Sequence, residues 1–200
     1  YKILHPTLIS DEGFYNPIST INIKNKQNIS DDCLLIINRT SRGKKGEYVG
    51  ISCFYDVNQY GLGQHNQGLY RISDYNKLEK LFIVCLLNSD IYRKICGCIS
   101  IGSKMKEMKS ADFSEIKFLN FPENIRQNIV EEYYKKNDFN RDSLLTIDNY
   151  IKNSKDRNKT IGIFQNFCEL VNLRNKLEDI IDKIIYNKEI IIEEYLNELS

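Results

Sequence analysis

The chain has almost no alanine, no tryptophan and few histidines, and these gaps exclude several kinds of chemistry. Its 200 residues include one Ala, no Trp, three Pro and two His, which are His5 and His65. Two histidines and no Gly-x-Ser-x-Gly motif leave almost no material for nucleophilic catalysis by Ser or Cys. The chain also has 29 Ile and 22 Asn, a skew that we attribute to A+T-rich codons rather than to function.

Long apolar runs and an excess of charge are also missing. No uninterrupted apolar stretch approaches the ~18 residues that span a bilayer, and residues 1–6 lack the apolar core of a signal peptide. Lys and Arg total 28 and Asp and Glu 27, so the net charge of +1 excludes a polybasic or acidic tail. We therefore expect a cytoplasmic protein without membrane contact. Because the first residue is Tyr1 and not Met, we also expect a fragment or a processed chain.

The cysteines predict buried free thiols and not disulfides. They are Cys33, Cys53, Cys85, Cys96, Cys98 and Cys168. The first three lie inside apolar runs, and a long chain without a secretory signal is typical of a reducing compartment. The only close pair, Cys96 and Cys98, has C-x-C spacing and no second pair near a histidine, so we expect no zinc site.

Motifs of nucleotide and metal enzymes are incomplete. The segment 43–46 lacks the spacing of a Walker loop, and Gly61-Leu62-Gly63 precedes no helical pattern. Glu115-Ile116-Lys117 has the shape of a nuclease metal site without the strand context that such a site requires. Asn16-Pro17-Ile18 departs from the tetrapeptide of adenine methyltransferases. We therefore assign no catalytic residue, metal or cofactor to this chain.

The hydrophobic pattern predicts an α+β fold with a β-rich head, short helices and a long C-terminal helix. Continuous or alternating apolar residues predict strands at 33–37, 48–54, 69–72 and 114–121. Apolar residues at helical spacing predict helices at 76–88, 90–96 and 124–134, with one more at 143–153. Polar loops are expected at 38–46, 57–68 and 103–109.

From 161 to 199 the apolar positions recur mostly at helical intervals, which predicts a coiled-coil-like helix more than about 50 Å long. Residues 1–120 have 16 basic and 12 acidic residues, whereas 121–200 have 12 and 15. We therefore divide the chain into a head at 1–120, an exit helix and connector at 121–160, and a long helix at 161–200.

Several segments match one known pattern in order. They are 29–36, 39–52, 67–72, the helix 78–88, 102–108, the strand 116–118, Phe121-Pro122 and 126–130. In this order they resemble the target-recognition domain of type I restriction–modification specificity subunits. The same module is fused to methyltransferases in some single-chain restriction enzymes. Asp31-Asp32 stands where the family usually has Gly-Asp, and residues 136–160 intervene before the long helix.

The resemblance implies that loops from a curved sheet lie along double-stranded DNA, with Lys and Arg on phosphates and Arg, Gln, Asn and Ser on base edges. The candidate DNA-binding residues are Arg39, Ser41, Arg42, Lys44, Lys45, Gln64, His65, Asn66, Gln67, Lys104, Lys106 and Lys109. For any one of these lysines a merely solvated side chain is the simpler interpretation, and Gln64 and Asn66 can instead satisfy turn backbone groups.

The long helix is expected to pair with a second recognition half or with another copy of the chain. Its candidate contacts are Phe164, Phe167, Val171, Leu177, Ile181, Ile184, Ile191 and Tyr195. The resemblance implies a non-catalytic subunit, encoded by a bacterium or phage, that directs an adenine-N6 methyltransferase to its site. S-adenosylmethionine is then bound by the partner methyltransferase, and a restriction subunit is an optional further partner.

Two other functions remain open at this point. The chain can be the C-terminal recognition part of a fused type II methyltransferase–nuclease, which the missing initiator methionine allows. It can also be a helical protein-interaction adaptor without any DNA role.

Overall fold

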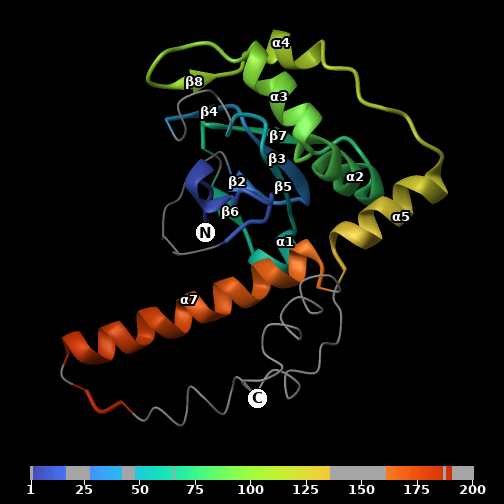
Figure 1. Ribbon diagram of the computed structural model, residues 1–200. Coiled ribbons are helices and arrows are strands. Elements are labelled where there is room, and N and C mark those ends of the chain that lie inside the picture. The colour runs from blue at the N-terminus through green and yellow to red at the C-terminus, as the bar shows by residue number, and fades with distance from the viewer. Residues whose placement is uncertain are drawn as a thin grey trace, which may run out of the picture. The chain divides into compact units, whose positions relative to one another are not determined.

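The chain is an α+β protein, seen here in a computed structural model that describes residues 2–16, 28–41, 48–64, 66–135, 161–186 and 188–190. It divides into two compact units, Tyr1–Glu131 and Glu132–Ser200. All the strands that the structure describes lie in the first unit, and the long C-terminal helix lies in the second (Figure 1).

A three-stranded antiparallel sheet forms the centre of the first unit. Strand β3 (Cys33–Ile37) lies between β5 (Ser52–Tyr55) and β7 (Leu69–Ile72). All five residues of β3 are buried, which confirms the buried strand predicted from this apolar run. Aliphatic side chains on both faces of β3 therefore anchor the core, since burial of each stabilises the fold by roughly 1.5–3 kcal/mol.

Two smaller sheets flank this centre. Strands β1 (Lys2–Ile3), β6 (Gly63–Gln64) and β2 (Asn28–Ile29) form one in the order β1-β6-β2. Strands β4 (Arg39–Thr40) and β8 (Lys106–Glu107) form the other. A short 3-10 helix, Pro6–Leu8, follows β1.

The loop predicted at 57–68 contains regular structure that its polar composition did not predict. Helix α1 (Val57–Tyr60) begins after Asp56, whose carboxylate accepts hydrogen bonds from the N–H groups of Asn58 and Gln59. Strand β6 follows at once. The N–H of Val57 donates to the Oδ1 of Asp32 at 2.8 Å, so two aspartates satisfy the first N–H groups of this helical turn.

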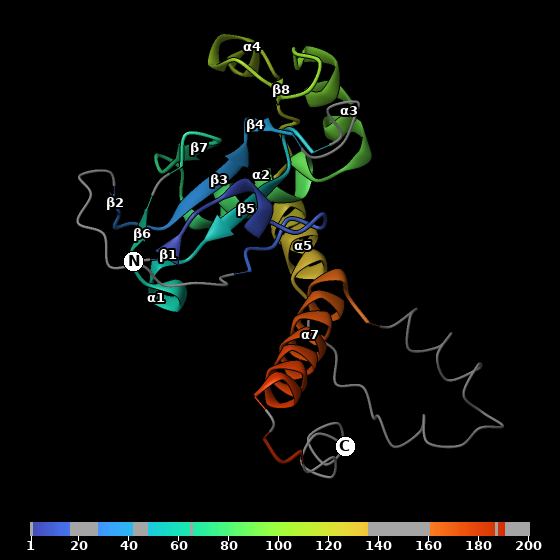
Figure 2. The same cartoon turned by 90° about the vertical axis from the view of Figure 1, so that its left-hand side faces the viewer.

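Helix α2 (Lys77–Leu87) packs on β5 and β3, and Figures 1 and 2 show it against the central sheet. It begins with a reciprocal capping box between Asn76 and Glu79. Helices α3 (Asp90–Ile99), α4 (Ser110–Ser114) and α5 (Glu123–Tyr133) follow. The predicted helices at 76–88, 90–96 and 124–134 are thus confirmed, although α3 continues through Gly97.

The strand predicted at 114–121 is wrong, because its backbone is held by a side chain instead of a neighbouring strand. The hydroxyl of Tyr92 donates to the carbonyl of Lys117 and accepts from the N–H of Leu119, both at 3.0 Å. Phe118, between them, stacks on the Tyr92 ring at 5.6 Å between centroids. The segment runs on from α4 without entering a sheet.

The strand predicted at 48–54 begins later than expected, at Ser52. Residues 48–50 form a turn in which Gly50 has a φ of +91°. Glycine adopts this left-handed conformation without the steric penalty that other residues incur. The turn therefore delays the strand by four residues.

In the second unit, helix α7 (Ile163–Ile185) is shorter than the helix predicted at 161–199. Its 23 residues correspond to about 35 Å at 1.5 Å per residue, and Tyr186 follows as its C-cap. Residues 191–199 and the helix predicted at 143–153 lie outside the described residues. Among the described helices, not one has the length and apolar character required to cross a membrane.

Candidate nucleic-acid interface

The first and third predicted loops meet as two paired strands at one end of the head. Strand β4, from the first loop, pairs antiparallel with β8, from the third, and the register sets Arg39 opposite Glu107 and Thr40 opposite Lys106. In both views this pair lies toward α3 and α4 (Figures 1 and 2). Two basic segments more than sixty residues apart in the chain thus share one small sheet.

A single buried residue, Asn38, ties all three loops together through its backbone. Its N–H donates to the carbonyl of Gly68 at 3.1 Å, and that carbonyl also accepts from the N–H of Arg39 at 3.3 Å. The Asn38 carbonyl accepts from the N–H of Met108 at 2.8 Å. We call this arrangement of Asn38, Gly68 and Met108 the loop junction.

The side chains around the loop junction are mostly basic. Arg39, Lys104 and Lys109 are exposed and Lys106 is half-buried. The Nε of Arg39 donates to the Sδ of Met105 at 2.8 Å, which bridges β4 to the residue before β8. Glu107 is the acidic residue of this pair of strands. The local excess of positive charge suits a phosphate backbone.

The second loop contributes less than the sequence predicted. Gln67 is exposed beside the loop junction, but the Oδ1 of Asn66 accepts from the N–H of Gly68 at 2.7 Å and so shapes the turn. Gln64 lies in β6, paired with β1 and β2, and its Oε1 is buried without a partner. The structure therefore does not bring Gln64 to the basic side chains.

The five remaining predicted DNA-binding residues are an exposed serine and four residues that the structure does not describe. Ser41 is exposed at the end of β4. Arg42, Lys44, Lys45 and His65 lie outside the described residues.

Buried apolar and aromatic side chains support the loop junction from the side of the core. Met108 is fully buried, and the hydroxyl of Tyr70 donates to its carbonyl. The Tyr70 ring also contacts Phe113 of α4, with centroids 5.8 Å apart. Rigid support of this kind lets exposed loop side chains meet a ligand in a defined position.

The buried cysteines of the described ranges are not activated as nucleophiles, and no cluster of metal ligands forms there. Burial raises the pKa of Cys33 and Cys96 to about 11, and that of Cys85 to about 12, so these thiols stay neutral at physiological pH. All six cysteines are free, with Cys98 and Cys168 exposed. No three His, Cys, Asp or Glu side chains of this part of the chain gather as metal ligands would.

The long helix α7 divides its predicted contact residues between two environments. Phe164, Phe167 and Val171 are half-buried, and the Phe164 ring lies 5.8 Å from that of Tyr134. Leu177, Ile181 and Ile184 are exposed. Ile191 and Tyr195 lie outside the described residues.

Sequence patterns missed the residues that organise the interface. Asn38 follows a buried strand and was grouped with a polar loop, although it is 7% exposed. Met105 and Met108 stand in a basic segment, yet Met105 contacts Arg39 and Met108 belongs to the core.

Comparison with protein-family models, curated proteins and solved structures finds no match for this chain.

Proposed function

We propose that the chain is a sequence-specific DNA-recognition module of a restriction–modification system, which directs an adenine-N6 methyltransferase to its site. The observation that carries this proposal is the convergence of two basic loops on one small sheet. Arg39, Lys104, Lys106 and Lys109 come from these loops, and Gln67 directly precedes Gly68 of the loop junction. Arg39 lies opposite Glu107 and Lys106 opposite Thr40, so the two basic side chains project to opposite faces of the paired strands.

In such an interface the chemistry of each side chain decides whether it contacts a phosphate or a base edge. Lysines neutralise phosphates as point charges and set the position of the module on the duplex. Arg39 can donate two hydrogen bonds to guanine, and Gln67 can pair with adenine, so these two side chains are suited to base edges. Methyl transfer takes place on the partner subunit, which binds S-adenosylmethionine, and this chain supplies no catalytic group.

The direct test is fluorescence anisotropy of the chain assembled with its methyltransferase on randomised duplexes, followed by sequencing of the bound fraction. We expect enrichment of one sequence and an affinity that falls steeply with salt. Binding without sequence preference, or no binding, would contradict the proposal.

A specific observation also supports a helix-pairing role for the second unit. Leu170, Leu173, Leu177 and Ile184 are exposed on α7 and follow the three-and-four spacing of a coiled-coil seam. Pairing with the helix of a second copy or a second recognition half covers this seam. In a recognition module such pairing fixes the distance between two half-sites. If the chain has no affinity for DNA, the same pairing supports the alternative function of a helical protein-interaction adaptor.

A further inference from the structure

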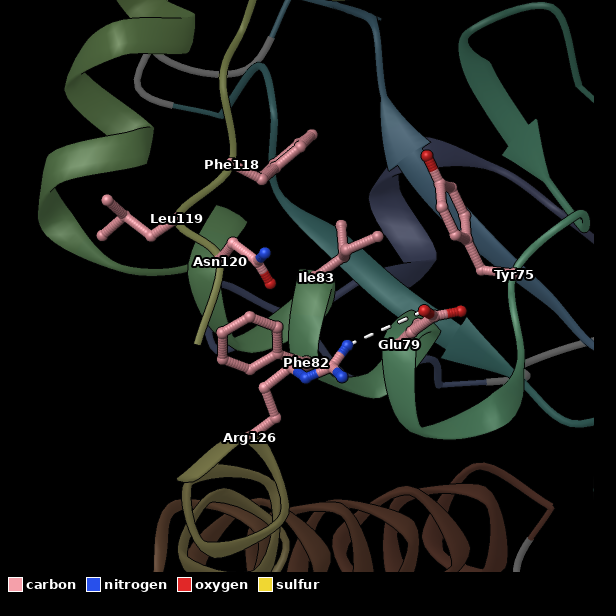
Figure 3. A pocket seen from close by; sticks show the side chains of 8 residues that line it. All are labelled: Tyr75, Glu79, Phe82, Ile83, Phe118, Leu119, Asn120 and Arg126. Atoms are coloured by element: carbon pink, nitrogen blue, oxygen red, sulfur yellow. Dashed lines mark ion pairs between the residues drawn. The ribbon is translucent and has the colours of Figure 1, made fainter. Parts of the chain in front are cut away.

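A pocket of about 180 Å³ opens beside α2 in the first unit, away from the residues of the loop junction (Figure 3). Aromatic side chains wall it: Tyr75 from the segment before α2, Phe82 from α2 and Phe118 from the segment after α4. In the view of Figure 3, Ile83 lies between Tyr75 and Phe118. Apolar walls of this kind suit a flat ring.

The walls are held in place before any ligand arrives. Phe118 stacks on Tyr92 at 5.6 Å with an interplanar angle of 16°, and Phe82 meets Phe121 edge-on at 6.0 Å. Tyr75, by contrast, is 47% exposed at the margin. A ring entering the pocket therefore meets two fixed aromatic surfaces and one side chain that is open to solvent.

Three polar side chains in the pocket have unused hydrogen-bonding capacity. The Nε of Arg126 is buried without a partner, which costs about 1–3 kcal/mol for a donor of this kind. Its Nη1 lies 3.7 Å from the Oε1 of Glu79, beyond hydrogen-bond length, so the two groups attract without being bonded. Asn120 has no hydrogen bond within the part of the chain that the structure describes.

The carboxylate of Glu79 is oriented by the helix it begins. Its Oε2 accepts from the N–H of Asn76 at 3.1 Å, and the Asn76 Oδ1 accepts from the N–H of Glu79 at 2.9 Å. This capping box fixes Glu79 Oε1 toward Arg126 from α5 (Figure 3). A donor and an acceptor are thus set side by side at one edge of the pocket.

The charges and the size select the ligand. One carboxylate balances one guanidinium, so the pocket suits a neutral group with adjacent donors and acceptors more than a phosphate. The volume exceeds the ~150 Å³ that accepts a benzene ring and lies below the ~300 Å³ of sites for drug-sized molecules. A single planar heterocycle meets both conditions.

We propose that this pocket binds one guanine base against Phe118, with Tyr75 at the open margin. The N7 and O6 acceptors of guanine accept from the Arg126 fork, and its neighbouring N1–H donates to Glu79. Adenine places an amino donor where guanine has O6, so it faces Arg126 with the wrong group. The base comes either from a free guanine nucleotide or from a nucleotide turned out of a DNA strand.

Calorimetric titration of the whole chain with GMP and with AMP tests the proposal, and short single strands that contain one dG or one dA distinguish the two sources. We expect GMP, the dG strand or both to bind at least tenfold more tightly than the adenine counterpart. Equal binding of the two bases, or no binding of any of them, would overturn the proposal.

Two variants locate the binding. Arg126→Lys keeps the charge but removes the two-pronged donor, and we expect at least tenfold weaker guanine binding with an unchanged thermal unfolding midpoint. Lys94→Gln, at an exposed position on α3 that does not line the pocket, serves as the control and leaves guanine binding unchanged. If Lys94→Gln weakens guanine binding as much as Arg126→Lys does, the loss reflects overall charge and the pocket assignment fails, whatever the outcome of the duplex-recognition test.

Discussion

The side-chain amide of Asn88 holds both main-chain hydrogen-bonding groups of Ser52. Its Oδ1 accepts from the Ser52 N–H at 3.0 Å, and its Nδ2 donates to the Ser52 carbonyl at 2.9 Å. Ser52 begins β5, an outer strand of the central sheet, and Asn88 directly follows α2. The amide thus stands where a further strand would pair and joins the helix end to the sheet edge.

Removal of this amide should destabilise the fold. Asn88→Ala leaves two partly buried main-chain groups without partners, and we expect a loss of about 2–4 kcal/mol in the free energy of unfolding. Urea denaturation followed by circular dichroism measures it. Asn58→Ala, at an exposed position on α1, is the matched control and should stay within about 0.5 kcal/mol of the wild type. A similarly small effect of Asn88→Ala would show that the bidentate contact contributes nothing.

Two glycines with positive φ values differ in the space around them. Gly50 and Gly61 have φ values of +91° and +80°. A Cβ on Gly50 would lie 2.5 Å from the Cβ and Sγ of Cys96, whereas a Cβ on Gly61 would meet nothing within 4 Å. Gly61 has a ψ of −169°, a conformation that essentially only Gly adopts, so we expect Gly61→Ala to cost about 1–3 kcal/mol from backbone strain alone, and Gly50→Ala to cost clearly more. Thermal unfolding of both variants decides this, and equal losses would mean that the Cys96 contact relaxes freely.

The buried thiols predict a loss of stability at alkaline pH. Burial raises the pKa of Cys33, Cys85 and Cys96 from 9.0 to about 11, 12 and 11. Once the pH exceeds 9.0, the unfolded chain releases protons that the folded chain retains, so the unfolding free energy decreases with rising pH. The contribution is complete below that value and is lost as the pH rises through the folded-state values.

Urea midpoints at about pH 8 and about pH 10.5 measure this decrease. Replacement of Cys85 by Ala removes one of the titrating groups, so the difference between the two midpoints should shrink. Cys98→Ala changes an exposed thiol and should leave the difference as it is in the wild type. A urea midpoint at the higher pH that is no lower than the midpoint at the lower pH would contradict the buried, protonated state of these cysteines.

On the proposed function, single substitutions of the basic residues beside the loop junction should weaken DNA binding. For Lys106→Gln we expect a salt slope of log K lower by about one and a similar loss of affinity on every sequence. Arg39→Gln should in addition relax the preference at one base position, because Arg39 is assigned to a base edge. Anisotropy at several salt concentrations provides both quantities.

Lys94 on α3 is an exposed lysine outside the loop junction, and Lys94→Gln controls for bulk charge. If all three variants lower the salt slope equally, the basic loops have no special position on the duplex.

The exposed seam of α7 should control self-association. The double substitution of Leu173 and Leu177 by Ser removes its two central apolar side chains, and we expect a dimer to dissociate at least tenfold more readily. Sedimentation velocity over a range of concentrations measures this. Asn172→Ser, at an exposed position one residue away, should not change the sedimentation. A wild-type chain that remains monomeric at high concentration would contradict self-pairing.

The sequence predicted the parts of the fold that depend on local pattern. The apolar run of β3 and the helical spacing of α2 were enough, because each element buries a face defined by its own residues. The segment 114–121 has the alternation of a strand, but the distant hydroxyl of Tyr92 takes the place of a strand partner. No local pattern contains that contact.

The candidate site was predicted in composition but not in arrangement. Basic residues were recognised in the first and third loops, yet only the pairing of β4 with β8 joins the two segments in one small sheet and sets Arg39 opposite Glu107. Gln64 was grouped with its loop neighbours although it belongs to another sheet. Neighbours in the sequence are not neighbours in the fold here. Gln64 and Gln67 are only three residues apart, yet Gln64 lies in β6 and Gln67 lies beside the loop junction, so the sequence predicted too large a role for the second loop.

The loop junction is held by main-chain hydrogen bonds, whereas the side chains beside it are exposed. Its bonds run from Asn38 and Arg39 to Gly68, and from Met108 to Asn38, and every one of them joins main-chain atoms. Such bonds form with any side chain other than proline, so Lys106 can be exchanged without loosening the junction, whereas exchange of Arg39 also removes its hydrogen bond to the Sδ of Met105. If the proposed function holds, such a scaffold can acquire a new recognition sequence by exchange of exposed side chains alone, which makes it a suitable starting point for directed evolution of specificity.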